Sequence, residues 1–308
     1  MRCLFLALAI LFFFLAATSP SAEQNIDGCV IAVNSFTGAK VLLVDDKGYC
    51  NEKFPLGSAI KPFTVLSAFE SGFDPSLVVR CYPSSPNKPV RISCWYRPGH
   101  GLVDLEKAIA FSCDRYFMEL EKLINWHVFV KVLADFSIIS NKDTLALKAM
   151  DRQAWLESMV GLNPAIKVSP FNLLLAYCAL FNGGYLFEIG TTGMPKLKRK
   201  IAVNRKAQEV LTKGMKSATE YGTAIEIGKA YPFLRILSKT GTGVFSYDNI
   251  IDRSRTHGWY IGLVNFPRQF AETPAIALLA FSFNGTGATD AVPLALKFFP
   301  QVTRNVVH

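Results

Sequence analysis

The two ends of the chain carry short apolar runs of the kind that form strands. Cys29 to Asn34 is apolar and β-branched, Ser35 to Gly38 has the composition of a turn, and Ala39 to Val44 is again apolar, which predicts a hairpin. Three further strand-like runs lie near the C-terminus: Arg235 to Thr240, Gly258 to Val264, and Ala275 to Ser282.

Between these strands, apolar residues recur at helical spacing. Phe63 to Ser71 places Leu66 and Phe69 on one side and stops at Gly72. The stretch from Trp126 to Pro164 is also helical in pattern, though less regular. The other predicted helices are Asp104 (as N-cap) to Phe111, Tyr116 to Leu123, Phe171 to Phe181, Gln208 to Thr219, and a last helix capped by Thr289 or Asp290 and running to about Phe299.

This order of elements predicts an α+β fold. An antiparallel sheet built from both chain ends is flanked by helices and carries an inserted, mostly helical subdomain. We expect the sheet subdomain to cover about 26–62 and 205–308, and the helical subdomain about 63–204.

The first residues are typical of an export signal. Arg2 is followed by an apolar run from Leu4 to Ala17, which is short for a membrane span. We predict a signal peptide at 1–22 and a catalytic domain at 25–308. An uncleaved membrane anchor is the alternative. Both interpretations export the rest of the chain to the periplasm or cell envelope, at the outer face of the cytoplasmic membrane.

Export permits disulfides among the six cysteines that follow Cys3. Cys81 and Cys94 bracket a Pro- and Ser-rich loop, and we predict that they pair. Cys29 and Cys50 lie near the ends of the first hairpin and could also pair.

Several other residues are expected to have structural roles. No cysteine or histidine spacing matches a metal motif, so no metal is predicted. Cys113 and Cys178 are predicted to be small buried residues, His100 and His257 to be structural turn and strand residues, and Trp95 and Trp259 to lie in the core.

The chain is basic, with a formal charge of +9. Such a charge could favour acidic partners, for example anionic envelope polymers or lipid headgroups, but we interpret it as mostly a solvated surface. Lysines and arginines are scattered apart from the run at Lys196 to Lys200, and no nucleic-acid-binding motif is present, so we expect no nucleic-acid partner.

Candidate chemistry begins at Ser58 and Lys61, which share one face of a helix. A serine hydroxyl is a weak nucleophile until a base takes its proton, and a neutral lysine amine can do so. Later, Lys239-Thr240-Gly241-Thr242 ends a predicted strand and offers a cation, hydroxyls and open backbone to a carboxylate.

Ser58-x-x-Lys61, Ser112-Cys113-Asp114 and Lys239-Thr240-Gly241 follow one another in an order known from penicillin-binding proteins and class A β-lactamases. With these motifs, the chain resembles the transpeptidase domain of penicillin-binding proteins, closest to the elongation-type class B members. The segments that extend the resemblance are Cys94-Trp95, Gly99-His100-Gly101, Ala108-Ile109, Val168-Ser169-Pro170, Asn182-Gly183-Gly184, Gly222-Thr223-Ala224 and His257-Gly258-Trp259-Tyr260-Ile261-Gly262.

The resemblance implies a role for each motif residue. Ser58 would attack the D-alanyl-D-alanine end of a peptidoglycan stem peptide, and a neutral Lys61 would be its base. Ser112 would relay a proton to the leaving amine, and Asp114 would bond Lys61 or the substrate. The carboxylate would be engaged by Lys239, Thr240 and Thr242 beside Gly241, with the Ser58 and Thr242 N–H groups as oxyanion hole. β-Lactams would trap Ser58, and no cofactor is implied.

Two departures from the family pattern keep alternatives open. Asp114 replaces the more usual asparagine, which puts the protonation of Lys61 in doubt, and the expected N-terminal pedestal domain is missing. A D,D-transpeptidase or carboxypeptidase is therefore weighed against a class D-like serine β-lactamase and against a non-enzymatic penicilloyl sensor.

Overall fold

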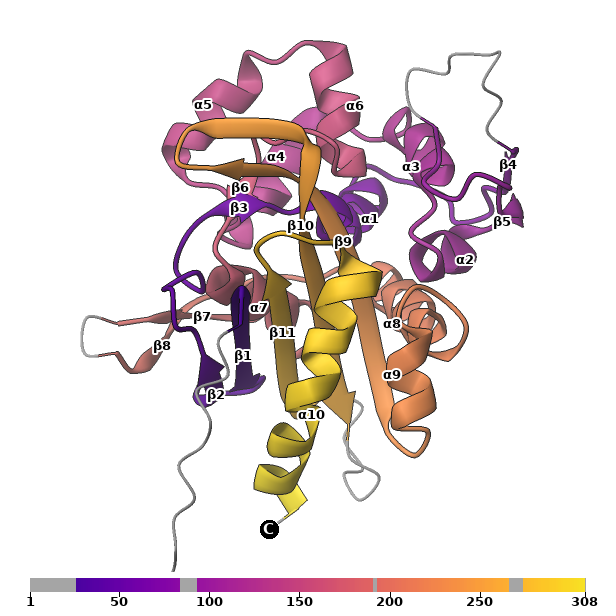
Figure 1. The fold of residues 1–308 in the computed structure, drawn as a ribbon. Helices are drawn as coiled ribbons and strands as arrows, with labels where there is room; N and C mark the ends of the chain where they lie inside the picture. The colour runs from indigo at the N-terminus through magenta and orange to yellow at the C-terminus, as the bar shows by residue number, and fades with distance from the viewer. Residues whose placement is uncertain (1–25, 84–92, 191–192, 266–273, 308) are drawn as a thin grey trace, which may run out of the picture.

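A five-stranded antiparallel sheet lies at the centre of the protein. The computed structural model describes residues 26–83, 93–190, 193–265 and 274–307. The strand order is β2-β1-β11-β10-β9, so the two strands from the N-terminal part of the chain lie side by side and pair through β1 with three strands from the C-terminal part (Figure 1). The bounds are β1 Gly28–Asn34, β2 Lys40–Val44, β9 Arg235–Tyr247, β10 Ile250–Asn265 and β11 Ile276–Ser282. The predicted fold class is confirmed.

The central strands are apolar on both faces because helices cover both faces of the sheet. Ile31 and Leu279, which are register partners in β1 and β11, belong to the larger apolar core, whereas the neighbouring pair Val30 and Ala280 faces a second one. This two-sided burial produces continuous apolar runs instead of strict alternation.

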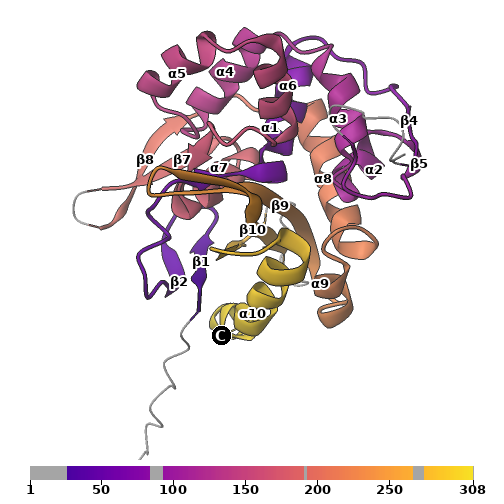
Figure 2. The ribbon, with the colours of Figure 1, turned by 45° about the horizontal axis from the view of Figure 1, so that its top comes forward.

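The helices divide between the two faces and one end of the sheet. α10 (Val292–Val307) packs on the second core with α9 (Ile225–Ala230), and Figure 1 shows α10 in front of the sheet. α7 (Pro170–Phe181) and α8 (Arg205–Glu220) cover the other face. Figure 2 shows the remaining helices grouped above the sheet. They are α1 Lys61–Glu70, α2 Leu105–Ala110, α3 Asp114–Glu121, α4 Trp126–Asp135, α5 Asn141–Lys148 and α6 Arg152–Val160.

Most predicted elements are confirmed, and the differences are one helix cap and three small sheets. Asp104 caps α2 by accepting a hydrogen bond from the Lys107 N–H. The predicted cap of the last helix is wrong: Thr289 and Asp290 lie inside a short π-helix, η2 (Gly287–Ala291), whose N-cap is Thr286. Three small two-stranded sheets were not predicted. They are β3–β6 (Phe54–Pro55, Lys167–Val168), β4–β5 (Val79–Cys81, Gly101–Val103) and β7–β8 (Tyr185–Ile189, Pro195–Lys200).

The predicted disulfides are wrong. Cys81 and Cys94 are free and buried, as are Cys29 and Cys50. Although each pair lies close in space, each thiol has further polar neighbours that a two-cysteine prediction leaves out. The predicted signal peptide lies outside the described residues, within which no helix has both the length and the apolar character needed to cross a membrane.

Candidate active site

The Ser58 turn is a single 3-10 turn, η1 (Gly57–Ile60), that leads directly into α1. The backbone N–H of Lys61 donates to the carbonyl of Ser58, and residues three apart eclipse one another in this geometry. Lys61 is fully buried, whereas Ser58 is partly exposed. The turn therefore presents a hydroxyl at the surface with an amine beneath it.

Close backbone packing fixes this turn against the sheet. Gly57 has φ +56°, and a Cβ there would lie 2.2 Å from the carbonyl oxygen of Thr242. The indole N–H of Trp259 donates to Pro55 (2.9 Å), and the Tyr177 hydroxyl donates to Ala59 (2.6 Å). Since such close approach needs glycine, residue 57 brings the Ser58 segment directly against β9.

The buried amine of Lys61 contacts the second motif, Ser112-Cys113-Asp114, through three acceptors. Its Nζ lies 2.8 Å from the Ser112 carbonyl, 3.3 Å from Ser112 Oγ and 2.6 Å from Asp114 Oδ1. The last contact is an ion pair between two buried groups. An ammonium supplies three protons for these three acceptors, so the resting site fits a charged Lys61 better than the neutral amine expected from sequence.

Ser112 joins the second motif to the third motif, Lys239-Thr240-Gly241. It lies between α2 and α3 with φ +52°, a left-handed conformation that is uncommon outside glycine. Its Oγ accepts a hydrogen bond from Lys239 Nζ at 2.9 Å, and that amine also donates to the Thr240 carbonyl at 2.6 Å. Burial, followed by the charge of Lys61, lowers the pKa of Lys239 well below its ordinary value. One serine oxygen therefore contacts both lysines.

The rest of the third motif borders this network. Thr240 is buried, and its hydroxyl donates to Thr223 Oγ1 at 2.7 Å, whereas Thr242 is exposed and accepts from the Gly287 N–H at 3.1 Å. Gly241 packs against the carbonyl of Leu56. Thr223 was not predicted as a site residue; the only signal for it is its place in the Gly222-Thr223-Ala224 segment.

Trp95 borders the site as well, and its predicted place in the core is wrong. Its side chain is 55% exposed. The Trp95 backbone N–H donates to Asp114 Oδ2 at 3.2 Å, and the indole N–H donates to the Phe111 carbonyl at 2.9 Å. Both oxygens of Asp114 are thus hydrogen-bonded, one to Lys61 and one to this backbone. Trp259, by contrast, is fully buried as predicted.

The two candidate histidines differ from one another. His257 is structural as predicted: its Nε2 accepts from the Ser246 N–H at 3.1 Å, and its Nδ1 bonds the Phe283 carbonyl. The Nδ1 of His100 instead lies 3.6 Å from Cys81 Sγ and 3.5 Å from Cys94 Sγ.

A fourth possible ligand, Cys113, completes this group. Its sulfur lies 4.0 Å from that of Cys94, and all four ligand atoms lie within 4.8 Å of one another. Their hydrogen bond lowers the pKa of the Cys94 thiol and, together with burial, raises that of Cys113. The fold thus gathers four possible metal ligands whose sequence spacing matches no motif, and the absence of a bound metal stays a prediction.

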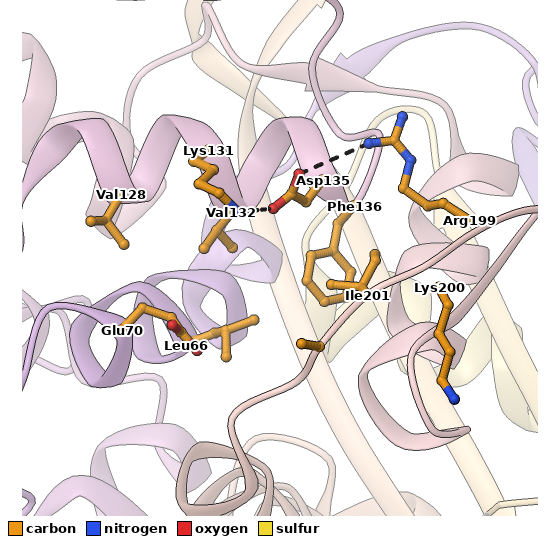
Figure 3. Close-up of a pocket in the computed structure, with 11 residues that line it drawn as sticks. Leu66, Glu70, Val128, Lys131, Val132, Asp135, Phe136, Arg199, Lys200 and Ile201 are labelled. Atoms are coloured by element: carbon orange, nitrogen blue, oxygen red, sulfur yellow. Dashed lines mark hydrogen bonds and ion pairs between the residues drawn. The ribbon is translucent and has the colours of Figure 1, made fainter.

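A separate pocket of about 400 Å³ lies behind α1 and contains none of the motif residues. Figure 3 shows Leu66 and Glu70 of α1 on one side of it and Asp135 of α4 on another. Asp135 forms ion pairs with Lys131 and Arg199. We assign this pocket no part in the chemistry of Ser58.

Comparison with known proteins agrees with this geometry. The family model described as the penicillin binding protein transpeptidase domain matches residues 28–270. The chain belongs to this family.

Individual relatives are more distant. The peptidoglycan D,D-transpeptidase MrdA of Haemophilus influenzae is 34% identical over 87 residues, which is 24% of this chain and only 13% of that protein. PBP2 of Pseudomonas aeruginosa has a similar fold, with a TM-score of 0.70 and 20% identity over 91% of this chain and 74% of its own. Penicillin-binding protein A of M. tuberculosis, solved as a ceftriaxone acyl-enzyme, has a TM-score of 0.69 and 18% identity over 92% of this chain and 74% of its own.

Proposed function

We propose that this protein is a serine D,D-transpeptidase or D,D-carboxypeptidase acting on D-alanyl-D-alanine stem peptides of peptidoglycan. The observation that carries the proposal is the position of Ser112 Oγ, which accepts from Lys61 at 3.3 Å and from Lys239 at 2.9 Å, with Lys61 itself one helical turn after Ser58. Three segments distant in sequence thereby form one acid–base network beside an accessible hydroxyl, which is the arrangement that acyl transfer requires.

The two lysines have to exchange a proton before Lys61 can act as a base. Lys239 is the amine that burial disfavours in its charged form. When a substrate carboxylate arrives, its negative charge favours a charged Lys239, and Ser112 provides the path by which a proton leaves Lys61 for Lys239. This transfer produces both groups that catalysis needs: a neutral base at Lys61 and a cation for the carboxylate.

Acylation then begins at the Ser58 hydroxyl. Ser58 Oγ forms a bond to the penultimate D-alanine carbonyl carbon and gives its proton to Lys61, while the backbone N–H groups of Ser58 and Thr242 stabilise the oxyanion. The amide C–N bond breaks as Ser112 passes the proton from Lys61 to the leaving D-alanine. An amine or water resolves the ester.

Thr240, Gly241 and Thr242 bind the substrate backbone and carboxylate with Lys239, and β-lactams acylate Ser58 in place of the dipeptide. The M. tuberculosis relative, solved as a ceftriaxone acyl-enzyme, supports this inhibitor class for the fold. The N-terminal apolar run supports export to the periplasm, where peptidoglycan lies, either as a cleaved signal or as an anchor.

We expect Lys239→Ala to remove recognition of the substrate carboxylate. The native protein should be acylated by a penicillin free acid far faster than by the methyl ester of the same penicillin, because only the acid pairs with Lys239. In Lys239→Ala the acid should slow by about 100-fold and the ester much less, so that the preference nearly disappears. Stopped-flow acylation rates measure both. An unchanged acid-to-ester ratio in the variant would remove Lys239 from this role.

The lifetime of the penicilloyl-enzyme separates the proposed activity from that of a β-lactamase. We expect the ester to persist for minutes to hours, with D-alanine released from a D-alanyl-D-alanine stem pentapeptide. Intact-mass spectrometry after rapid removal of free penicillin gives the lifetime, and a coupled D-alanine assay gives the peptidase activity. Hydrolysis of the ester within seconds would favour a β-lactamase. A long-lived ester without D-alanine release would favour a sensor.

A further inference from the structure

Five rings form a continuous row beside the Ser112 segment. They belong to Trp95, Tyr96, His100, Phe111 and Tyr221, and neighbouring ring centroids along the row lie between 5.0 Å and 5.6 Å apart. Three of these side chains are exposed to solvent: Trp95 to 55%, Tyr96 to 42% and Tyr221 to 43%. We call this group the aromatic row. Exposed apolar side chains that gather in one place are typical of a binding surface.

Backbone contacts hold the aromatic row in place. Phe111 and Tyr221 are the C-caps of α2 and α8. The indole N–H of Trp95 donates to the Phe111 carbonyl at 2.9 Å, and the Thr223 N–H donates to the Ala110 carbonyl at 3.1 Å. The two helix ends are therefore joined directly to each other. A surface that is already ordered loses little conformational freedom when a ligand binds to it.

The aromatic row borders the side of the site from which D-alanine would leave. Phe111 immediately precedes Ser112, the residue that passes a proton to the leaving amine in the mechanism above. Tyr221 lies two residues before Thr223, whose hydroxyl accepts from Thr240 at 2.7 Å in the motif that would bind the carboxylate. The leaving D-alanine carries both of these groups, so each end of its position has a ring close by in the chain.

An acyl acceptor has to enter where the leaving group departs. The ester on Ser58 is attacked by the reverse of the step that formed it, so the incoming nitrogen takes the place of the departed D-alanine nitrogen at Ser112. We propose that the aromatic row binds this acceptor, as a primary amine at the end of an aliphatic side chain of a second stem peptide. The inference rests on the proposed function and assigns Tyr221 a part in selecting an amine over water.

The chemistry of the aromatic row favours a cation on an apolar chain. Aromatic faces attract ammonium groups and also cover methylene groups. α8 directs its C-terminal end, which carries partial negative charge, at Tyr221, and its last turn holds no lysine or arginine. A neutral sugar would gain nothing from this helix end, and a carboxylate would be repelled by it.

The transfer step then uses the groups already described. The bound ammonium first loses one proton to solvent. Its nitrogen forms a bond to the ester carbonyl carbon and gives a second proton through Ser112 to Lys61. The bond between that carbon and Ser58 Oγ breaks, and Lys61 returns the proton to Ser58. Because the rings exclude water from this side of the ester, they favour transfer to the amine over hydrolysis.

The first test is the partition of the acyl-enzyme between amine and water. The full chain is incubated with a D-alanyl-D-alanine stem pentapeptide and Nα-acetyl-lysine amide, and liquid chromatography with mass spectrometry measures both products. The two products arise from one acyl-enzyme, so their ratio is independent of the acylation rate. Tyr221→Ala should lower the amine-to-water product ratio by about 5-fold, which corresponds to a cation–π contact of roughly 1 kcal/mol.

Two matched variants are the controls. Tyr221→Phe keeps the ring and should keep the native product ratio. Phe233→Ala removes a ring that is 87% exposed between α9 and β9, outside the aromatic row, and should keep the ratio as well. An equal ratio in Tyr221→Ala and the native chain would overturn the acceptor site and leave the proposed activity standing.

A binding measurement gives an answer even without turnover. In saturation-transfer difference NMR, the side-chain methylenes of Nα-acetyl-lysine amide should receive saturation from the native chain and from Tyr221→Phe, and much less from Tyr221→Ala. Binding that depends on Tyr221 in a chain that releases no D-alanine would support this site and overturn only the proposed activity. Equal saturation from Tyr221→Ala, or saturation of added N-acetylglucosamine in place of the amine, would overturn the proposal.

Discussion

Ser58→Ala should abolish covalent labelling by penicillin altogether. The Ser58 hydroxyl is the oxygen that would carry the acyl group, and it is partly exposed on a turn that the sheet holds rigidly. Alanine at 58 removes the nucleophile and leaves the turn's backbone contacts in place. Labelling with a fluorescent penicillin, followed by gel electrophoresis, should show no band for the variant even at long incubation.

Ser67→Ala is a matched control for this experiment. Ser67 lies on the same helix, is fully buried, and bonds the Phe63 carbonyl one turn earlier. Its loss should leave labelling close to that of the native chain. Full labelling of Ser58→Ala would mean that another residue is the nucleophile, and the proposed role of Ser58 would then be wrong.

Lys61→Met should combine the second-largest loss of activity with a loss of stability. Without its base, Ser58 should react about 10²–10⁴-fold more slowly. The same change leaves the buried carboxylate of Asp114 without its cation, 2.6 Å away in the native structure. Breaking a buried ion pair from one side costs about 3–5 kcal/mol, so the free energy of unfolding should fall by a similar amount.

A double variant separates these two effects. In Lys61→Met/Asp114→Asn no uncompensated charge remains, so urea unfolding should show most of the lost stability restored. Acylation measured by stopped flow should stay as slow as in Lys61→Met, because the base is still absent. Recovery of acylation together with stability would show that Lys61 acts only on the fold.

Local sequence patterns predicted the structure correctly where the contacts that determine it lie between residues close in the chain. Ser58 and Lys61 lie three residues apart, and the Gly57-containing turn fixes their relation whatever surrounds it. The hairpin of β1 and β2 and the apolar helix α7 follow from runs of side chains that need no partner to be recognised.

The elements that were not predicted depend on contacts between segments far apart in the chain, or on strands whose residues are polar. β3 pairs with β6 across more than one hundred residues, and neither two-residue strand has a pattern of its own. β9 and β10 extend beyond their apolar parts into an exposed hairpin whose turn residues, Asp248 and Asn249, have positive φ. Because the residues of this hairpin are largely polar, their sequence pattern did not predict a strand there.

The group formed by Cys81, Cys94, His100 and Cys113 shows the same limit most clearly. Cys81 and Cys94 flank a loop and were paired by proximity in sequence, whereas folding brings His100 and Cys113 to the same point. The surroundings of the Lys61 amine were likewise beyond prediction, because its three acceptors come from residues 112 and 114.

Peptide mapping of the penicillin adduct tests the central claim most directly. The full native chain is incubated with benzylpenicillin, quenched in acid, digested and analysed by tandem mass spectrometry. We predict a single adduct, equal to the mass of the intact penicillin, on Ser58 in the peptide that contains Gly57 and Lys61. An adduct on a different residue, or no adduct on a folded chain, would contradict the assignment of these three segments to one acyl-transfer site.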